Sequence, residues 1–328
     1  MEKNKLVSIN ILTYNGQDLI KPCLKSVLEQ TYPNLEILII DNASSDGSVG
    51  YLKKNYPQLR LIENKKNLGF SVGHNMAIKK SRGEFILCLN QDVVLDRDFI
   101  KKALAVFKED KKIGAVQGKL LRSQTGIIDT TGLIIFRNRR IISRGQGKED
   151  RGQYEKKEEI FGVDGAAPIY RRSALEDIKI NSEYFDEDFF LYKEDVDLAW
   201  RMRLAGWKSV YQPEAVGYHL RGSGDSAATS SWRIIQERRK ISGRAKYYSW
   251  KNQRLMQIKN EYPGLFLKDF MPIIWKEIRS LGYIIIFEPY LFKSIGKFFL
   301  QLPQAWQKRK TIMSRKRAAS QDIGKWFR

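Results

Sequence analysis

The stretch LVSINILTYNGQDLIKPCLKSVLEQTYPNLEILIIDNASSDGS, Leu6–Ser48, alternates between two hydrophobic periods. Leu6–Leu12 is a short apolar run with β-branched residues, which predicts a buried strand, and Leu35–Ile40 predicts a second. Between them, the apolar residues of Gln17–Glu29 recur at spacings that place them on one helical face. The same alternation continues with helices over 48–55, 72–80 and 99–107 and strands over 59–63 and 85–89. This pattern predicts an α/β fold with a mainly parallel sheet flanked by helices.

Length and composition exclude several classes of protein. The chain has 328 residues, of which 42% are hydrophobic, so it can bury the core of one large domain or of a domain plus an extension. The two cysteines, Cys23 and Cys88, lie in apolar runs, which excludes a disulfide framework and favours a reducing compartment. The two histidines exclude a multi-histidine metal cluster. We read the N-terminus as a first strand and not as a signal peptide, and no uncharged run reaches the roughly 18 residues of a spanning helix.

The positive charge is concentrated in the last third of the chain. The net charge is +21, from 58 Lys and Arg against 37 Asp and Glu. From Ala228 to the end there are 22 basic and 6 acidic residues, whereas the first 227 residues carry 36 and 31. Such charge favours anionic surfaces or polyanions. A nucleic-acid-binding protein is one alternative, but no zinc finger, RNA-recognition motif or helix-turn-helix is present, so we expect no specific nucleic acid partner.

Polar clusters follow three of the predicted strands, at Thr13–Gly16, Asp41–Ser48 and Asn90–Asp92. Loops that follow parallel strands share one edge of the sheet, and in open α/β sheets that edge holds the ligand. The alternative is that these residues only form turns. Because neither a P-loop nor a G-x-G-x-x-G motif is present, a nucleotide would be held by side chains and a bridging metal. Asp92 could bind a hard divalent cation that is shared with substrate phosphates.

The stretch Tyr184–Gly224 interleaves acidic and aromatic residues (YFDEDFFLYKEDVDLAWRMRLAGW) and ends in PEAVGYHLRGSG. Glu194 and Asp195 lie at the start of a predicted helix, Glu194–Ala205, where carboxylates are favoured as caps. A cap needs no aromatic surround, so the alternative is that these carboxylates belong to a functional site. His219 comes directly before a basic, Gly-rich segment that suits a loop closing over phosphates, although a lone histidine more often serves packing.

Six motifs occur in the order and spacing of a family 2 glycosyltransferase of the GT-A type, and the resemblance covers about residues 5–260. They are ILTYNG, IIDNASSDGS, NKKNLGFSVGHNMAI, LNQDVVL, YKEDVDLAWRMRLAGW and PEAVGYHLRGSG. The chain most resembles the rhamnosyltransferase-like branch, which makes bacterial surface polysaccharides and shares a KN-x-R-like segment, here Trp250–Arg254. The resemblance implies a GT-A catalytic domain over 1–228, with a nucleotide-sugar half over about 1–120 and an acceptor half over about 121–228.

The resemblance also assigns roles to single residues. Asp195, in the ED motif with Glu194, would be the general base. The donor side would comprise Thr13, Tyr14 and Asn15 at the nucleotide, Asp41 and Asn42 at the base or ribose, and Asn67, Gly73, Asn75, Asn90 and Gln91. Asp92 matches the last carboxylate of the DXD motif and would bind Mg²⁺ or Mn²⁺, with His219 completing metal or diphosphate binding. The first carboxylate of DXD is replaced by Asn90.

The reaction implied is inverting transfer of a sugar, L-rhamnose by branch resemblance, from a nucleotide-diphosphate donor to a hydroxyl of a glycan or lipid-linked glycan. Burial beside Phe189, Phe190 and Tyr192 should raise the pKa of Asp195 towards a useful value. The alternatives are an inactive GT-A-like binding protein and a nucleotidyltransferase on a similar α/β fold.

Residues 229–328 are expected to form a basic, helical extension with a poorly ordered tail over about 307–328. Its mixture of aromatic, aliphatic and basic residues suits an amphipathic helix on an anionic membrane, with packing on the catalytic domain or on a dimer partner as the alternative. We therefore expect a cytoplasmic protein, peripheral on the inner face of the membrane.

Overall fold

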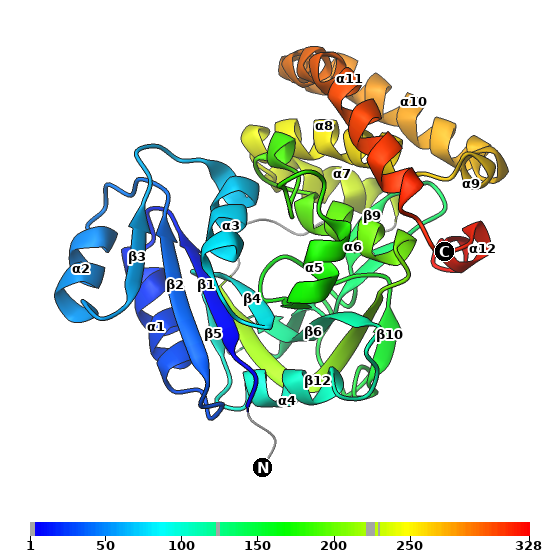
Figure 1. The fold of residues 1–328 in the computed structure, drawn as a ribbon. Coiled ribbons are helices and arrows are strands. Elements are labelled where there is room, and N and C mark those ends of the chain that lie inside the picture. Colours follow the sequence, from blue (N-terminus) through cyan, green and yellow to red (C-terminus); the bar gives the residue numbers. More distant parts are fainter. Residues whose placement is uncertain (1–3, 123–124, 221–226, 229) are drawn as a thin grey trace.

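A ten-stranded mixed sheet organises the part of the chain that the structure describes (Figure 1). The computed structural model describes residues 4–122, 125–220, 227–228 and 230–328. Its strands are β1 (Val7–Thr13), β2 (Leu35–Asp41), β3 (Arg60–Glu63), β4 (Phe85–Asn90), β5 (Val93–Leu95), β6 (Ile113–Arg122), β7 (Ile127–Thr130), β10 (Glu158–Ile160), β11 (Ile169–Arg171) and β12 (Lys208–His219). The order is β10-β12-β6-β11-β4-β1-β2-β3, with β5 beside β12 and β7 beside β6. A separate hairpin pairs β8 (Leu133–Ile135) with β9 (Ile141–Ser143).

The first four strands are parallel and end together. Thr13 lies opposite Asp41 on β2, and Leu12 lies opposite Asn90 on β4. This register brings the three polar clusters of the sequence to one edge, as expected. The sequence predicted a mainly parallel sheet, but the rest of the sheet is mixed, since β12 runs parallel to β6 and the other pairs are antiparallel. β11 runs antiparallel to both β4 and β6, because the chain between β6 and β11 returns through short strands and loops and not through a crossover helix.

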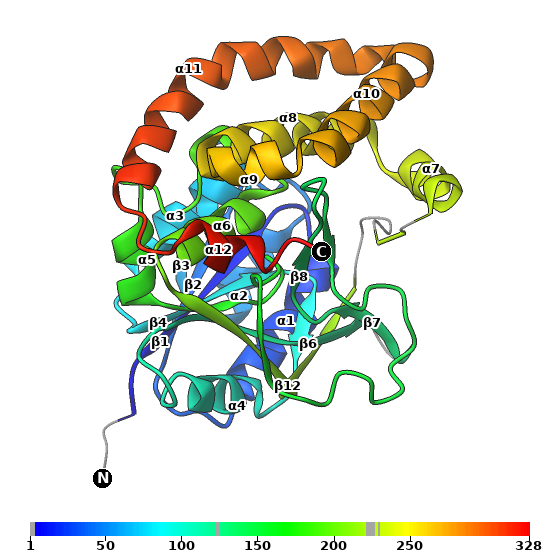
Figure 2. The same cartoon turned by 90° about the vertical axis from the view of Figure 1, so that its right-hand side faces the viewer.

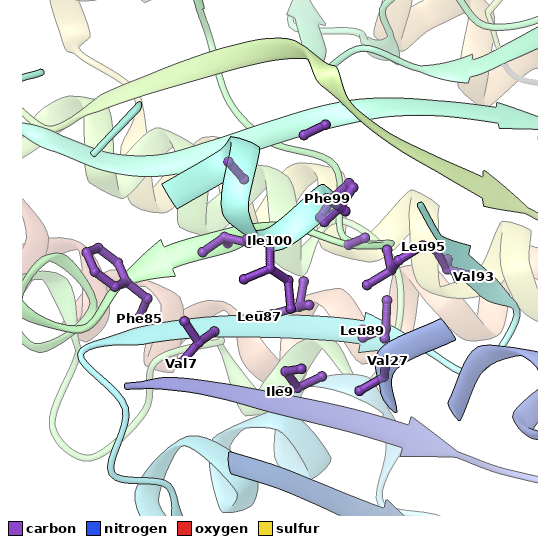
Figure 3. Packing of buried hydrophobic residues seen from close by; sticks show 14 of the residues in the cluster. Val7, Ile9, Val27, Phe85, Leu87, Leu89, Val93, Leu95, Phe99 and Ile100 are labelled. Carbon is purple, nitrogen blue, oxygen red and sulfur yellow. The ribbon is translucent and has the colours of Figure 1, made fainter. Parts of the chain in front are cut away.

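Helices cover both faces of the sheet, which explains the continuous apolar runs of the central strands. On one face, α1 (Gln17–Leu28) and α4 (Phe99–Val106) pack on residues that include Val7, Ile9, Leu87 and Leu89 (Figure 3). On the other face, α3 (Gly69–Lys80), α5 (Arg172–Ile178) and α6 (Glu194–Leu204) pack around Ile86 and Cys88. α2 (Ser48–Asn55) lies beside α1.

The C-terminal region is helical, as expected, and gathers above one end of the sheet in both views (Figures 1 and 2). It comprises α7 (Ser231–Lys240), α8 (Gly243–Asn260), α9 (Pro263–Lys268), α10 (Phe270–Phe287), α11 (Phe292–Ser314) and α12 (Ser320–Gly324), with a short 3₁₀ turn at Pro289–Leu291. Another 3₁₀ turn, Glu187–Phe189, lies in the loop before α6. The chain breaks between α7 and α8, because Ile241 and Ser242 are extended and the Ser242 hydroxyl accepts a hydrogen bond from the Ala245 N–H to start α8.

The tail differs from the poor order expected for about residues 307–328. α11 continues to Ser314, and Ile312, Ile323 and Phe327 are buried in one cluster with Trp200 of α6. The rings of Phe327 and Trp200 lie 5.7 Å apart, edge to face. These few apolar residues, spaced among many charges, bury enough surface to hold the tail on the protein.

Buried ion pairs connect the extension to the acidic loop before α6. Lys308 of α11 pairs with Glu183, Asp186 and Asp188 at 2.9, 2.6 and 2.9 Å. Lys259 of α8 also pairs with Asp186. The acidic residues of this loop therefore serve packing of the extension. Among the described helices, none combines the length and apolar character needed to cross a lipid bilayer.

Candidate active site

A cavity of about 330 Å³ opens at the carboxyl ends of β1, β2 and β4. Seven of the residues assigned to the donor side or the metal line it, namely Thr13, Tyr14, Asn42, Asn67, Asn90, Gln91 and Asp92. We call it the donor cavity. Gln91 joins two of its loops, because it accepts hydrogen bonds from the Thr13 hydroxyl (2.6 Å) and the Tyr14 N–H (3.0 Å).

Asp41 and Asn15 lie beside this cavity without lining it. Asp41 is buried, and one of its carboxylate oxygens accepts a hydrogen bond from the Ser44 N–H at 2.9 Å. The other oxygen has no hydrogen-bond partner within the described residues, an arrangement that a bound polar ligand would relieve. The Asn15 side chain accepts a hydrogen bond from the Ser45 N–H at 2.8 Å and so holds the loop after β2.

Gly73 and Asn75 support the donor cavity from behind and do not line it. A Cβ at Gly73 would lie 2.4 Å from the Leu12 side chain, so a glycine lets α3 approach β1. Asn75 is fully buried and bonds the backbone of Tyr184 and Phe185 and the Glu187 carboxylate. Its amide therefore docks the acidic loop on α3.

Asp92 and His219 meet because β5 pairs with the end of β12. Val93 lies opposite His219, and His219 Nε2 is 3.3 Å from Asp92 Oδ2. His219 Nδ1 lies 2.8 Å from Asp129, a buried carboxylate on β7 that the sequence analysis missed. Burial would lower the pKa of His219, but without a cation the hydrogen bonds with Asp129 and Asp92 outweigh it and raise the pKa to about 10, so a cation that binds this ring would displace its proton.

These residues fit a divalent cation of the kind that shares its ligands with a substrate. Asp92 offers a carboxylate and His219 an imidazole nitrogen, while Asp129 orients the ring in the way that carboxylates orient metal-binding histidines. In the described ranges no three His, Cys, Asp or Glu side chains are arranged as a complete metal site. A cation here would therefore take its other ligands from water and a diphosphate.

A second cavity, of about 450 Å³, contains Glu194 and Asp195 at the start of α6, and we call it the acceptor cavity. The N–H groups of Val196 (2.8 Å) and Gly165 (3.1 Å) each donate to one oxygen of Asp195. Burial, and then the neighbouring Asp164 carboxylate, raise the pKa of Asp195 to about 6. Burial and the Asp195 charge raise the pKa of Glu194 well above its usual range. The two N–H donors favour the ionised form of Asp195 against this burial.

The segment before α6 adopts an unusual backbone. Phe190, Tyr192 and Lys193 have φ values of 58°, 69° and 74°, in the left-handed region that non-glycine residues rarely adopt. The side-chain amide of Asn252 on α8 donates to the carbonyl oxygens of Phe189 (2.9 Å), Leu191 (3.0 Å) and Tyr192 (2.7 Å). One buried side chain from the extension thus fixes the turn that presents Asp195.

The donor and acceptor cavities adjoin. They share five lining residues, Phe70, Asn90, Leu191, Tyr192 and Ala245. His219 lines the acceptor cavity and contacts Asp92 of the donor cavity. Asp92 and Asp195 therefore line adjoining parts of one cleft.

The family model for "Glycosyl transferase family 2" matches residues 8–179, more than half of the chain. The chain belongs to glycosyl transferase family 2. This match confirms the resemblance to family 2 glycosyltransferases. It also gives no support to the alternative of a nucleotidyltransferase.

Curated relatives of this family 2 chain are similar over most of its length. It is 28% identical to the poly-beta-1,6-N-acetyl-D-glucosamine synthase of Staphylococcus epidermidis over 290 residues, or 86% of this chain and 60% of that one. The synthase of Staphylococcus aureus strain MSSA476 is 26% identical over 65% of this chain and 50% of its own length. The chain thus spans between half and two thirds of the length of these relatives.

Solved structures share its GT-A fold. A crystal structure of residues 1–349 of TarS from S. aureus aligns with a TM-score of 0.56 and 18% identity, covering 94% of this chain and 89% of that one. A crystal structure of GalNAc-T7 with UDP, GalNAc and Mn²⁺ aligns with a TM-score of 0.57 and 13% identity, covering 79% of this chain and 48% of that one.

Several residues of this glycosyltransferase cleft escaped the sequence analysis. Asp164 lines the acceptor cavity and accepts a hydrogen bond from the Ser143 hydroxyl at 2.9 Å. It follows no predicted strand and lies in a small-residue stretch, GVDGAAP, that reads as an ordinary loop. Lys193 belongs to the ED motif that the sequence analysis quoted, but nothing in the spacing singled it out.

Proposed function

We propose that this chain catalyses inverting transfer of a sugar from a nucleoside-diphosphate sugar to a hydroxyl of a cell-surface glycan or its lipid-linked precursor. The observation that carries the proposal is the adjoining pair of cavities, one lined by the donor-side residues and the other by Asp195. A two-substrate transfer needs such an arrangement, because the acceptor must approach the face of the sugar opposite the leaving diphosphate.

Asp195 is the general base in this proposal. An acceptor hydroxyl is a poor nucleophile, so a carboxylate must take its proton as the new C–O bond forms, which is typically worth about 10²–10⁴-fold in rate. A pKa of about 6 leaves Asp195 ionised at neutral pH and still basic enough to accept that proton. Burial and the Asp195 charge raise the pKa of Glu194, the direction that limits the repulsion between the two carboxyl groups.

The donor diphosphate would lie near Asp92 and His219, which would hold Mg²⁺ or Mn²⁺. The cation would supply positive charge for the leaving diphosphate. Thr13, Tyr14 and Asn42 line the same cavity, and the unpartnered oxygen of Asp41 would accept a hydrogen bond from the base or ribose. Asp129 keeps the His219 ring oriented throughout.

The transferred sugar has two candidates, each with its own support. The sequence resembles the rhamnosyltransferase-like branch, which supports L-rhamnose. The printed activity of the curated relatives, synthesis of poly-beta-1,6-N-acetyl-D-glucosamine, supports N-acetylglucosamine and a role in cell-surface polysaccharide synthesis.

The location proposed for the reaction is the inner face of the membrane. α10 and α11 form the outermost pair of helices (Figure 2), and they expose Met271, Trp275 and Leu300 at 74%, 63% and 77%. Large exposed apolar side chains beside many lysines and arginines suit the surface of an anionic bilayer. A lipid-linked acceptor would be presented there.

A panel of nucleotide sugars tests this proposal. Thermal unfolding would be followed with UDP-N-acetylglucosamine, dTDP-L-rhamnose and GDP-mannose, each with Mn²⁺, with Mg²⁺ and with chelator. We expect one donor to raise the Tm, and the same donor to be turned over when radiolabelled. Stabilisation without any turnover would support the inactive binding protein, and no stabilisation by any donor would contradict the proposal.

A further inference from the structure

One wall of the acceptor cavity is built by the C-terminal extension and is rich in cations. Arg238 of α7, Arg254 of α8 and Lys276 of α10 all line the cavity, together with Ser280 of α10. Arg254 ends the KN-x-R-like segment, whereas Arg238, Lys276 and Ser280 belong to none of the motifs quoted from the sequence. The wall therefore belongs to the acceptor side of the cleft and is supplied by the part of the chain beyond the family match.

Positive charge is in surplus on this wall. Arg254 and Lys276 both pair with one carboxylate, Glu277, and the Lys276 Nζ to Glu277 distance is 2.7 Å. Arg238 and Lys246 likewise share Glu288. Glu237 of α7 also lines the cavity, so three cations of this wall and the adjoining Lys246 are matched by three carboxylates.

The surplus charge is held in place and partly desolvated. The Arg254 guanidinium lies 3.7 Å from the centre of the Trp250 ring and donates to the Trp250 carbonyl oxygen at 2.8 Å. The side chains of Arg254 and Lys276 are only 14% and 21% exposed. Burial lowers the pKa of Lys276, and it lowers the pKa of Arg254 to about 10. A partly buried cation without a full counter-charge is costly unless an anion binds it.

We propose that Arg254 and Lys276 form a subsite for a phosphate group of the acceptor. The inference rests on the proposed function and names the class of acceptor. A planar guanidinium and a flexible ammonium together suit an anion with three or more oxygens, and both residue types bind phosphate. Phosphate bound there would lie in the cavity that contains the general base, so its hydroxyl-bearing portion could reach Asp195.

Two sources would supply the phosphate, a lipid diphosphate or a phosphodiester polymer. The geometry of α10 accommodates the first, because Lys276 and Ser280 line the cavity while Trp275 and Ile278 of the same helix are exposed at 63% and 56%. Geranyl diphosphate and bis(glycero)phosphate represent the two sources, and glucuronate represents a carboxylate.

The test uses the full chain with its donor cavity occupied. The protein would be saturated with Mn²⁺ and UDP, or with whichever nucleoside diphosphate stabilises it most, so that the probes cannot enter the donor cavity. Binding of each probe would be measured by titration calorimetry. We expect one phosphate probe to bind and Lys276→Met to weaken it about tenfold, the effect of losing one charge-assisted hydrogen bond. Arg254→Met should do the same, Lys276→Arg should restore most of the affinity, and Lys268→Met on the exposed side of α9 should change nothing.

Three results would overturn the inference. They are glucuronate binding as tightly as the phosphate probes, phosphate binding that Lys276→Met leaves intact, and no probe binding to a protein that still binds its nucleoside diphosphate. Because Arg254 packs on Trp250, the Tm of Arg254→Met would be measured as a check that this variant folds. If it does not fold, the comparison of Lys276→Met with Lys276→Arg decides the inference. Failure of the proposed function is a separate result, in which neither a nucleoside diphosphate binds nor a donor is turned over.

Discussion

Two neighbouring carboxyl groups at the start of α6 are set apart by their surroundings. Glu194 is 5% exposed and one of its oxygens has no hydrogen-bond partner among the described residues, whereas two N–H groups donate to Asp195. These bonds stabilise the ionised form and partly offset burial. The Asp195 pKa accordingly stays at about 6, while that of Glu194 rises further.

The pH dependence of transfer follows from the Asp195 pKa. The base must be unprotonated, so the rate should increase as pH rises through about 6 and level off above 7. The measurement is kcat/KM against pH at fixed Mn²⁺. An inflection near 4, the ordinary range of aspartate at about 3.9, would show that burial does not tune this group.

Asp92 is predicted to act through a cation. Asp92→Ala should weaken nucleotide-sugar binding about 10–100-fold with Mn²⁺ present, the scale of one or two charge-assisted interactions. In chelator the variant and the unaltered protein should bind equally weakly. Asp96→Ala, a short distance along the chain and outside both cavities, is the matched control. The same loss in chelator as in Mn²⁺ would remove the metal role.

At the scale of elements, the turn over residues 190–193 depends on a helix that is distant in sequence. Asn252→Leu would leave three carbonyl oxygens without their shared donor, at a cost of about 2–4 kcal/mol in unfolding free energy. We expect kcat to fall far more than KM rises, because the turn presents Asp195. Gln257→Leu on the same helix is the control. Equal kcat values for Asn252→Leu and Gln257→Leu would show that the turn over residues 190–193 keeps its conformation without the Asn252 hydrogen bonds.

The elements that the sequence predicted well are those with local causes. α2 and α6 begin where the periodicity and capping signals placed them, at Ser48 and Glu194, and the polar strand ends meet at one edge. Contacts distant in sequence were not predictable in this way. Asp129 reaches His219 through the pairing of β7 and β12 with β6, and the order of the tail depends on Phe327 meeting Trp200.

At the scale of the whole molecule, the basic extension has two different sides. On the side that faces the catalytic domain, lysines of the extension form buried ion pairs, such as that of Lys308 with Asp186. Away from it, α10 and α11 expose apolar and basic residues together. The charge asymmetry of the sequence therefore combines a structural role with an exposed surface, which the proposed function assigns to the membrane.

Membrane association is tested by pelleting with vesicles. The protein should sediment with vesicles that contain phosphatidylglycerol and much less with phosphatidylcholine alone, and added salt should weaken binding. Trp275→Glu combined with Leu300→Glu should abolish sedimentation without lowering the Tm, since both side chains are exposed. Equal sedimentation of the double variant would assign these helices to another partner.

The substitution Asp195→Asn tests the central claim most directly, with transfer and donor binding measured on the same preparation. A raised carboxyl pKa means that ionised Asp195 lowers stability at neutral pH, so the asparagine variant should keep or raise its Tm. We predict that transfer falls by about 10²–10⁴-fold while the affinity for the donor stays nearly unchanged. Undiminished transfer, or a parallel loss of transfer and donor binding, would contradict the account.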